Sequence, residues 1–77
     1  MNQERIAVDP KVCFGKPIIR GTRIPVYMVL ELIEQGLNPE DIIKQCYPDL
    51  TLEDIKACLH YAASVLKNEE VSIQEVS

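Results

Sequence analysis

The sequence predicts an α+β fold, mostly α, in which a short N-terminal β-hairpin precedes a three-helix bundle resembling a helix-turn-helix. Short β-prone runs broken by Pro and Gly fill the first 25 residues, and apolar residues then recur at helical spacing. A chain of 77 residues is long enough for one domain. We assign that domain to residues 1–67, with the hairpin region at 6–25, the bundle at 26–67 and a C-terminal tail at 68–77.

The hairpin region holds several short runs of β-prone residues. Ile6–Val8 and Val12–Phe14 are such runs, and each is followed by turn residues. Ile18–Ile19 and Arg23–Ile24 are separated by a short segment that contains Gly21. Because glycine adopts the positive φ that tight hairpin turns need, we expect the chain to reverse at Gly21.

Two helices are expected in the middle of the chain. The first runs over Val26–Gln35 and stops at Gly36, a residue suited to the left-handed end of a helix. The second runs over Pro39–Cys46. Asn38 is its N-cap, and proline at the first helical position loses no hydrogen bond.

The third helix is predicted over Leu52–Lys67, where Thr51 and Asp54 form a variant of the capping box. Two apolar lanes run along it. The first consists of Leu52, Ile55, Leu59, Ala62 and Leu66. The second consists of Cys58, Tyr61 and Val65. So small a bundle does not need both lanes for its core, so either the hairpin or a second copy of the chain covers the second lane. We therefore expect a homodimer.

The tail has two possible interpretations. Its alternation of apolar and polar residues suits a strand that joins the sheet edge of a partner, with Val71, Ile73 and Val76 as contacts. The other interpretation is a frayed terminus.

Catalysis is not expected. His60 is the only histidine, and it lies on a polar lane where nothing nearby in sequence forms a Cys–His or Ser–His–Asp set. The three cysteines, Cys13, Cys46 and Cys58, do not have the spacing of a metal site, so we expect reduced thiols and neither a metal nor a cofactor. Without a signal peptide or an apolar run that could span a bilayer, the expected location is the cytoplasm and no membrane partner is expected.

The charge of the chain is uneven. Residues 1–26 hold five cationic and two acidic side chains, whereas residues 27–77 hold three and ten. Lys16, Arg20 and Arg23 are therefore the candidate contacts to nucleic-acid phosphates. The alternative contact to nucleic acid is the start of the third helix, because the second helix of a helix-turn-helix motif reads DNA with its N-terminal end. Acidic residues at that end would, however, repel phosphates.

Three segments carry a resemblance to a known family. Residues 13–26 read Cys-Phe-Gly-Lys-Pro-Ile-Ile-Arg-Gly-Thr-Arg-Ile-Pro-Val, and they resemble the signature of domain-of-unknown-function family 433. Gly36–Ile42 and Tyr47–Thr51 are also similar to that family, so the resemblance spans residues 6–66. It implies an antitoxin that dimerises, masks a PIN-like nuclease toxin and binds its own operator DNA. The alternative function is an adaptor that pairs with a protein partner and does not bind DNA.

Overall fold

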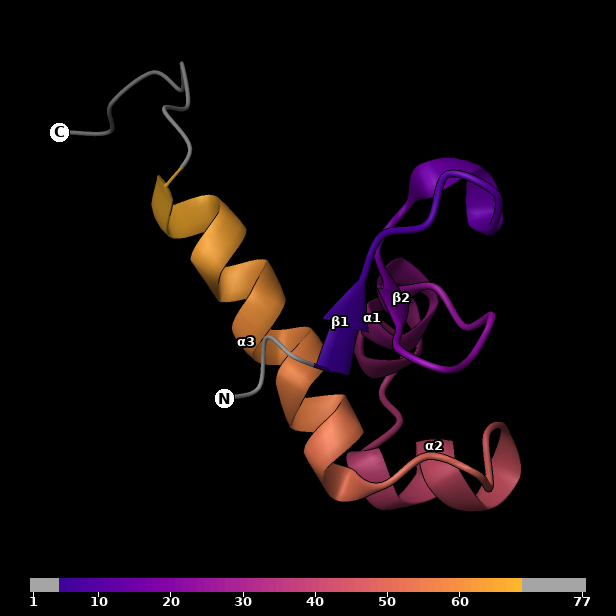
Figure 1. Cartoon of the computed structure of the whole chain (residues 1–77). Helices are drawn as coiled ribbons and strands as arrows, with labels where there is room; N and C mark the ends of the chain where they lie inside the picture. Colours follow the sequence, from indigo (N-terminus) through magenta and orange to yellow (C-terminus); the bar gives the residue numbers. More distant parts are fainter. Residues whose placement is uncertain (1–4, 69–77) are drawn as a thin grey trace, which may run out of the picture.

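The computed structural model describes residues 5–68, so the predicted tail contacts Val71, Ile73 and Val76 lie outside the described residues. The described chain has a short two-stranded sheet followed by three helices, which confirms the predicted fold class (Figure 1). Its elements are β1 (Ile6–Ala7), a 3-10 turn η2 (Cys13–Gly15), β2 (Ile18–Ile19), α1 (Val26–Glu34), α2 (Pro39–Gln45) and α3 (Leu52–Asn68).

The sheet pairs β1 and β2 antiparallel, with Ile6 opposite Ile19 and Ala7 opposite Ile18. The predicted reversal follows β2 directly. The Thr22 N–H donates to the Ile19 carbonyl at 3.0 Å, and Gly21 has a φ of 83°. This is the positive φ for which the turn needs glycine.

The segment after that turn is less regular than expected. The Ile19 N–H donates to the Ile24 carbonyl at 3.0 Å, and Ile18 forms an isolated bridge with Pro25. The segment Arg23–Ile24 therefore lies beside β2 without forming a strand of its own. The strand partner of β2 is β1, because Pro25 has no N–H with which to extend a ladder and α1 begins immediately after it.

The prediction of an extended Val12–Phe14 run is wrong. Cys13 and Phe14 have φ values of 52° and 57°, so the chain coils tightly there. The backbone satisfies its hydrogen bonds locally: the Val12 N–H donates to the Asp9 carbonyl at 2.9 Å, and the Gly15 N–H donates to the Val12 carbonyl at 3.1 Å. With its polar groups paired inside the loop, the run needs no partner strand.

The predicted ends of α1 and α2 are confirmed to within one residue. Gly36, just beyond α1, has a φ of 104°. The Asn38 side chain accepts a 2.8 Å hydrogen bond from the Asp41 N–H at the start of α2. These signals involve residues a few positions apart, so they do not depend on tertiary contacts.

The capping box of α3 is also confirmed. The Thr51 N–H donates to Oδ2 of Asp54 at 3.0 Å, and the Asp54 N–H donates to Oγ1 of Thr51 at 3.2 Å. From this start α3 runs for 17 residues. Its first half packs among the other elements, and its last turns run past the sheet and away from α2 (Figure 1).

The core is aliphatic and lies where the sheet and the first half of α3 meet the other two helices. Its buried members are Ile6, Ile19, Val26, Val29, Ile42, Leu50, Ile55, Ala57 and Cys58. Cys58 is fully buried within one chain, which corrects its assignment to an interface with another molecule. Leu59 and Leu66 of the first predicted lane are instead 44% and 64% exposed, because the other elements cover α3 on the Ile55 and Cys58 side.

Candidate functional site

Two open grooves flank the C-terminal half of α3. The larger, which we call the β1 groove, has a volume of about 540 Å³ and lies between β1 and the last turns of α3. Its lining is mainly apolar and includes Ile6, Ala7, Val8, Tyr61 and Val65. Val8, one of these lining residues, is 60% exposed, so an apolar side chain of this groove faces solvent.

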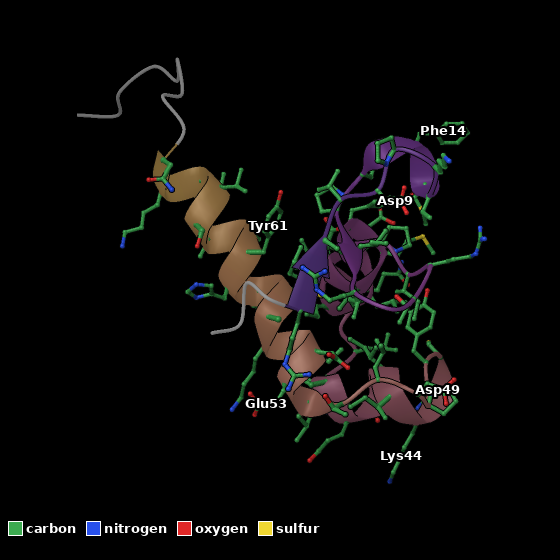
Figure 2. All side chains as sticks on the ribbon, viewed as in Figure 1. Asp9, Phe14, Lys44, Asp49, Glu53 and Tyr61 are labelled. Carbon is green, nitrogen blue, oxygen red and sulfur yellow. The ribbon has the colours of Figure 1, made fainter. Side chains whose placement is uncertain are left out.

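The smaller groove, which we call the α1 groove, has a volume of about 350 Å³ and lies between α1 and α3. Its lining includes Tyr27, Leu30, Tyr61, Val65 and Leu66. Tyr61 and Val65 line both grooves, and Figure 2 shows Tyr61 on the side of α3 that faces the sheet. These two residues of the second apolar lane, from which Cys58 is assigned to the core, therefore form the ridge between the grooves.

Sequence reasoning missed Val8 and Tyr27 as surface apolar residues. Val8 belongs to a β-prone run that continues past the two residues of β1, and only the sheet pairing shows where the strand stops. Tyr27 lies off the apolar face of α1 formed by Val26 and Val29. This position beside the apolar face could have been used to predict from the sequence that Tyr27 is exposed.

The three predicted phosphate contacts are all exposed, but their surroundings differ. The Lys16 ammonium lies 5.7 Å from the centre of the Tyr27 ring, a cation–π distance. The Arg20 N–H donates to the Arg5 carbonyl at 2.6 Å. The Arg23 carbonyl accepts a 3.5 Å hydrogen bond from the Cys13 thiol, which joins the turn after β2 to the coiled loop.

That loop presents Phe14, which is 97% exposed. Figure 2 shows Phe14 at the tip of the loop, pointing away from the body of the molecule, with Asp9 on the inner side of the loop. Sequence reasoning placed Phe14 in a strand and assigned no role to it. A positive φ at a phenylalanine has no sequence signal apart from the neighbouring glycine.

The start of α3 is acidic. Asp54 accepts a 3.0 Å hydrogen bond from the Arg5 guanidinium, and Glu53 lies 3.9 Å from the Lys56 ammonium. Burial raises the pKa of Asp54, but hydrogen bonds from Thr51 and Arg5 and the positive charge of Arg5 lower it more, so the pKa lies below its ordinary value. Asp54 is therefore ionised at neutral pH, and this end of α3 is poorly suited to contact phosphates.

The cysteines do not form a reactive site. Burial, with a contribution from the Asp54 charge, raises the pKa of Cys58 to about 11, so it is a protonated thiol at neutral pH. Cys46 is exposed and Cys13 is partly buried. Within residues 5–68, no three His, Cys, Asp or Glu side chains are grouped so that they could hold a metal ion. In the same range, no helix combines the length and apolarity needed to cross a membrane.

Known proteins resemble this chain in sequence and structure. The chain is 33% identical over 60 residues to the uncharacterized protein y4eO of Sinorhizobium fredii. The aligned segment covers 78% of this chain and 27% of that protein. The chain is 70% identical over 23 residues to an uncharacterized protein of Archaeoglobus fulgidus, and this aligned segment covers 30% of this chain and 64% of that protein. The chain thus spans less than two thirds of either relative.

A solved structure shares the fold. The crystal structure of a DUF433 member protein from Anabaena variabilis matches with a TM-score of 0.76 and 37% sequence identity, over 84% of this chain and 63% of that one. The family model described as protein of unknown function (DUF433) matches residues 6–62. Because this match covers most of the chain and the fold agrees with a solved member, the chain belongs to the DUF433 family.

Proposed function

We propose that this protein is a cytoplasmic, non-enzymatic binding module of the antitoxin type, which forms a homodimer and masks a PIN-like nuclease toxin. One observation carries the proposal: Tyr61 and Val65 form a ridge on the C-terminal half of α3 with a mainly apolar groove on each side of it. Removing apolar side chains of this size from water contributes roughly 1.5–3 kcal/mol each. The resemblance of residues 13–26 to the family signature supports the choice of an antitoxin.

The second copy of the chain covers the exposed leucines of α3. Leu52, Leu59 and Leu66 recur every seven residues and form one stripe, and each is at least 44% exposed. A seven-residue repeat keeps its members on one side of a helix, as in paired helices. A twofold contact between two such stripes is self-complementary, which is the commonest way in which identical chains pair.

The β1 groove receives the nuclease. Its α3 lining includes Ser64 and Asn68 beside the shared Tyr61 and Val65, whereas Leu66 of the leucine stripe lines only the α1 groove. Tyrosine is enriched among the residues that contribute most to protein interfaces. Dimer and toxin would therefore bind different faces of one helix, so each can be disrupted by its own substitution.

Operator DNA is the second proposed partner. Lys16, Arg20 and Arg23 would provide up to six phosphate contacts in a dimer, two from each of the three positions. The adaptor alternative, in which the protein never binds DNA, is favoured by two observations: carboxylates occupy the start of α3, and the Lys16 ammonium lies against Tyr27.

Sedimentation and co-purification test the protein contacts. Leu59→Glu should convert the dimer to monomers at micromolar concentration, while Val8→Glu should leave the dimer intact and abolish co-purification with the product of the adjacent gene, which we expect to be a nuclease. His60→Ala is the control, because His60 is exposed but belongs neither to the lining of the grooves nor to the leucine stripe. A wild-type monomer would contradict the dimer, and a folded protein that does not retain the nuclease would contradict the antitoxin role.

A further inference from the structure

We infer that Phe14 stacks against the bases of a nucleic acid whose phosphates are held by the cationic residues around it. This inference rests on the proposed contact with nucleic acid and adds base contact to it. Phe14 is the only phenylalanine of the chain, yet it is 97% exposed while the core is built from aliphatic residues.

The loop holds Phe14 in this position by a dense set of local bonds. The Asp9 carboxylate accepts a 2.9 Å hydrogen bond from the Lys11 N–H, and the Asp9 carbonyl accepts another from the Val12 N–H. The Lys16 N–H donates to the Cys13 carbonyl at 3.1 Å and closes the far side of the loop. An aromatic ring presented by an ordered loop loses little conformational entropy when it binds a partner.

The backbone beneath the ring is strained. Cys13 and Phe14 are the non-glycine residues with positive φ in the described part of the chain, and they are adjacent. A left-handed backbone is unfavourable for residues that carry a Cβ, and for a bulky side chain it is a genuine outlier. Strained residues of this kind concentrate at binding sites, where the surrounding structure holds them in place. Here the strained residue is also the most exposed large apolar side chain.

The charges around the loop favour a nucleic acid over an apolar protein pocket. Lys11, Lys16 and Arg23 are exposed cations on the loop and on the turn bonded to it through Cys13. Asp9 is the nearby acid, and its carboxylate accepts a hydrogen bond inside the loop. An exposed aromatic ring on a segment that also carries cations is an arrangement with which proteins stack single-stranded bases or wedge between the base pairs of a duplex.

A tryptophan reporter tests the stacking directly. The chain contains no Trp, so Phe14→Trp introduces a single tryptophan at the tip of the loop, which can be excited selectively over the three tyrosines. We expect its emission to be quenched on binding a labelled single strand of about 12 nucleotides or the duplex upstream of the gene. Comparison of the two probes shows whether unpaired bases or a base-pair step is the source of the stacking.

Affinity measurements separate stacking from charge. Phe14→Ala should weaken binding by roughly 5- to 150-fold without changing its salt dependence, because stacking of a base contributes about 1–3 kcal/mol. Phe14→Tyr should restore most of the affinity. Met28→Ala, which shortens an exposed apolar side chain on α1, should have no effect. A thermal melt should match the wild type for each variant.

The outcomes also separate this inference from the function on which it rests. Unchanged affinity of Phe14→Ala, or an unquenched Phe14→Trp reporter in a saturated complex, would overturn the stacking role while nucleic-acid binding stands. Loss of nuclease binding by Phe14→Ala with intact nucleic-acid binding would make Phe14 a protein anchor and overturn the inference. A wild-type dimer that binds the nuclease but neither nucleic-acid probe would overturn the inference together with the DNA contact, and would leave the adaptor function.

Discussion

The guanidinium of Arg5 donates a 3.0 Å hydrogen bond to Oδ1 of Asp54 and so joins the residue before β1 to the first turn of α3. The other carboxylate oxygen of Asp54 accepts from the Thr51 N–H. One side chain therefore both caps α3 and fixes the helix to the sheet. Because the grooves lie between β1 and α3 and between α1 and α3, this contact helps to position the walls of the proposed binding surface.

Acid should weaken this contact. The pKa of Asp54 is lower in the folded chain than in the unfolded one, so its contribution to stability is present above the unfolded pKa of about 3.9 and is lost as pH falls through the folded value. We expect Asp54→Asn to be less stable than the wild type at pH 7 and the difference to shrink in acid. Urea unfolding at several pH values measures it. A difference that stays constant down to the acid limit would contradict this role.

Gly21 should be needed for its backbone alone. A Cβ built at Gly21 would meet no heavy atom within 4 Å, so crowding does not oppose a side chain, but its φ of 83° does. We expect Gly21→Ala to lower the free energy of unfolding by about 1 kcal/mol or more. Gly21→Asn should cost less, because asparagine tolerates a left-handed backbone better. Equal stability of all three proteins in thermal melts would refute the turn.

The thiols should differ in reactivity. Cys58 is fully buried with a pKa of about 11, whereas Cys46 is exposed. Since the thiolate is the reacting form, a thiol reagent at neutral pH should modify Cys46 quickly and Cys58 only when the chain unfolds. Peptide mapping after timed labelling identifies the modified residues. Rapid labelling of Cys58 in the folded protein would contradict the complete burial of this side chain.

Salt should reveal the phosphate contacts. With up to six contacts in a dimer, DNA affinity should fall by about three orders of magnitude between roughly 50 and 200 mM salt. Replacing Arg20 and Arg23 by Ala should remove about four of these contacts and flatten the dependence. Replacing Lys56 and His60 on α3 should change it little. If replacing Lys56 and His60 instead weakens DNA binding more, and if the loss of affinity varies with DNA sequence, the third helix reads the DNA as a recognition helix.

The parts of the fold that follow from short-range chemistry could be predicted from the sequence. The reversal at Gly21, the caps at Asn38 and Thr51, and the stop at Gly36 each depend on residues a few positions apart, and the structure confirms all of them. Helical periodicity likewise located the three helices to within one residue at each end.

The candidate site was less predictable because it depends on which face the other elements cover. Periodicity placed Cys58 and Leu59 in neighbouring lanes but could not show that the core takes Cys58 and leaves Leu59 exposed. Phe14 was missed because its exposure follows from hydrogen bonds within the loop, and hydrophobicity alone favours burial. Tyr61 and Val65 were assigned to an interface, and the structure places them on the walls of both grooves.

Titration of the adjacent gene's nuclease product with this protein tests the antitoxin function most directly. We expect nuclease activity to fall to zero once one chain is present for each nuclease chain. Val8→Glu should abolish this inhibition, and His60→Ala should preserve it. Leu59→Glu should inhibit as a monomer, because the leucine stripe is separate from the β1 groove. Full nuclease activity in the presence of an excess of folded wild-type protein would contradict the antitoxin function.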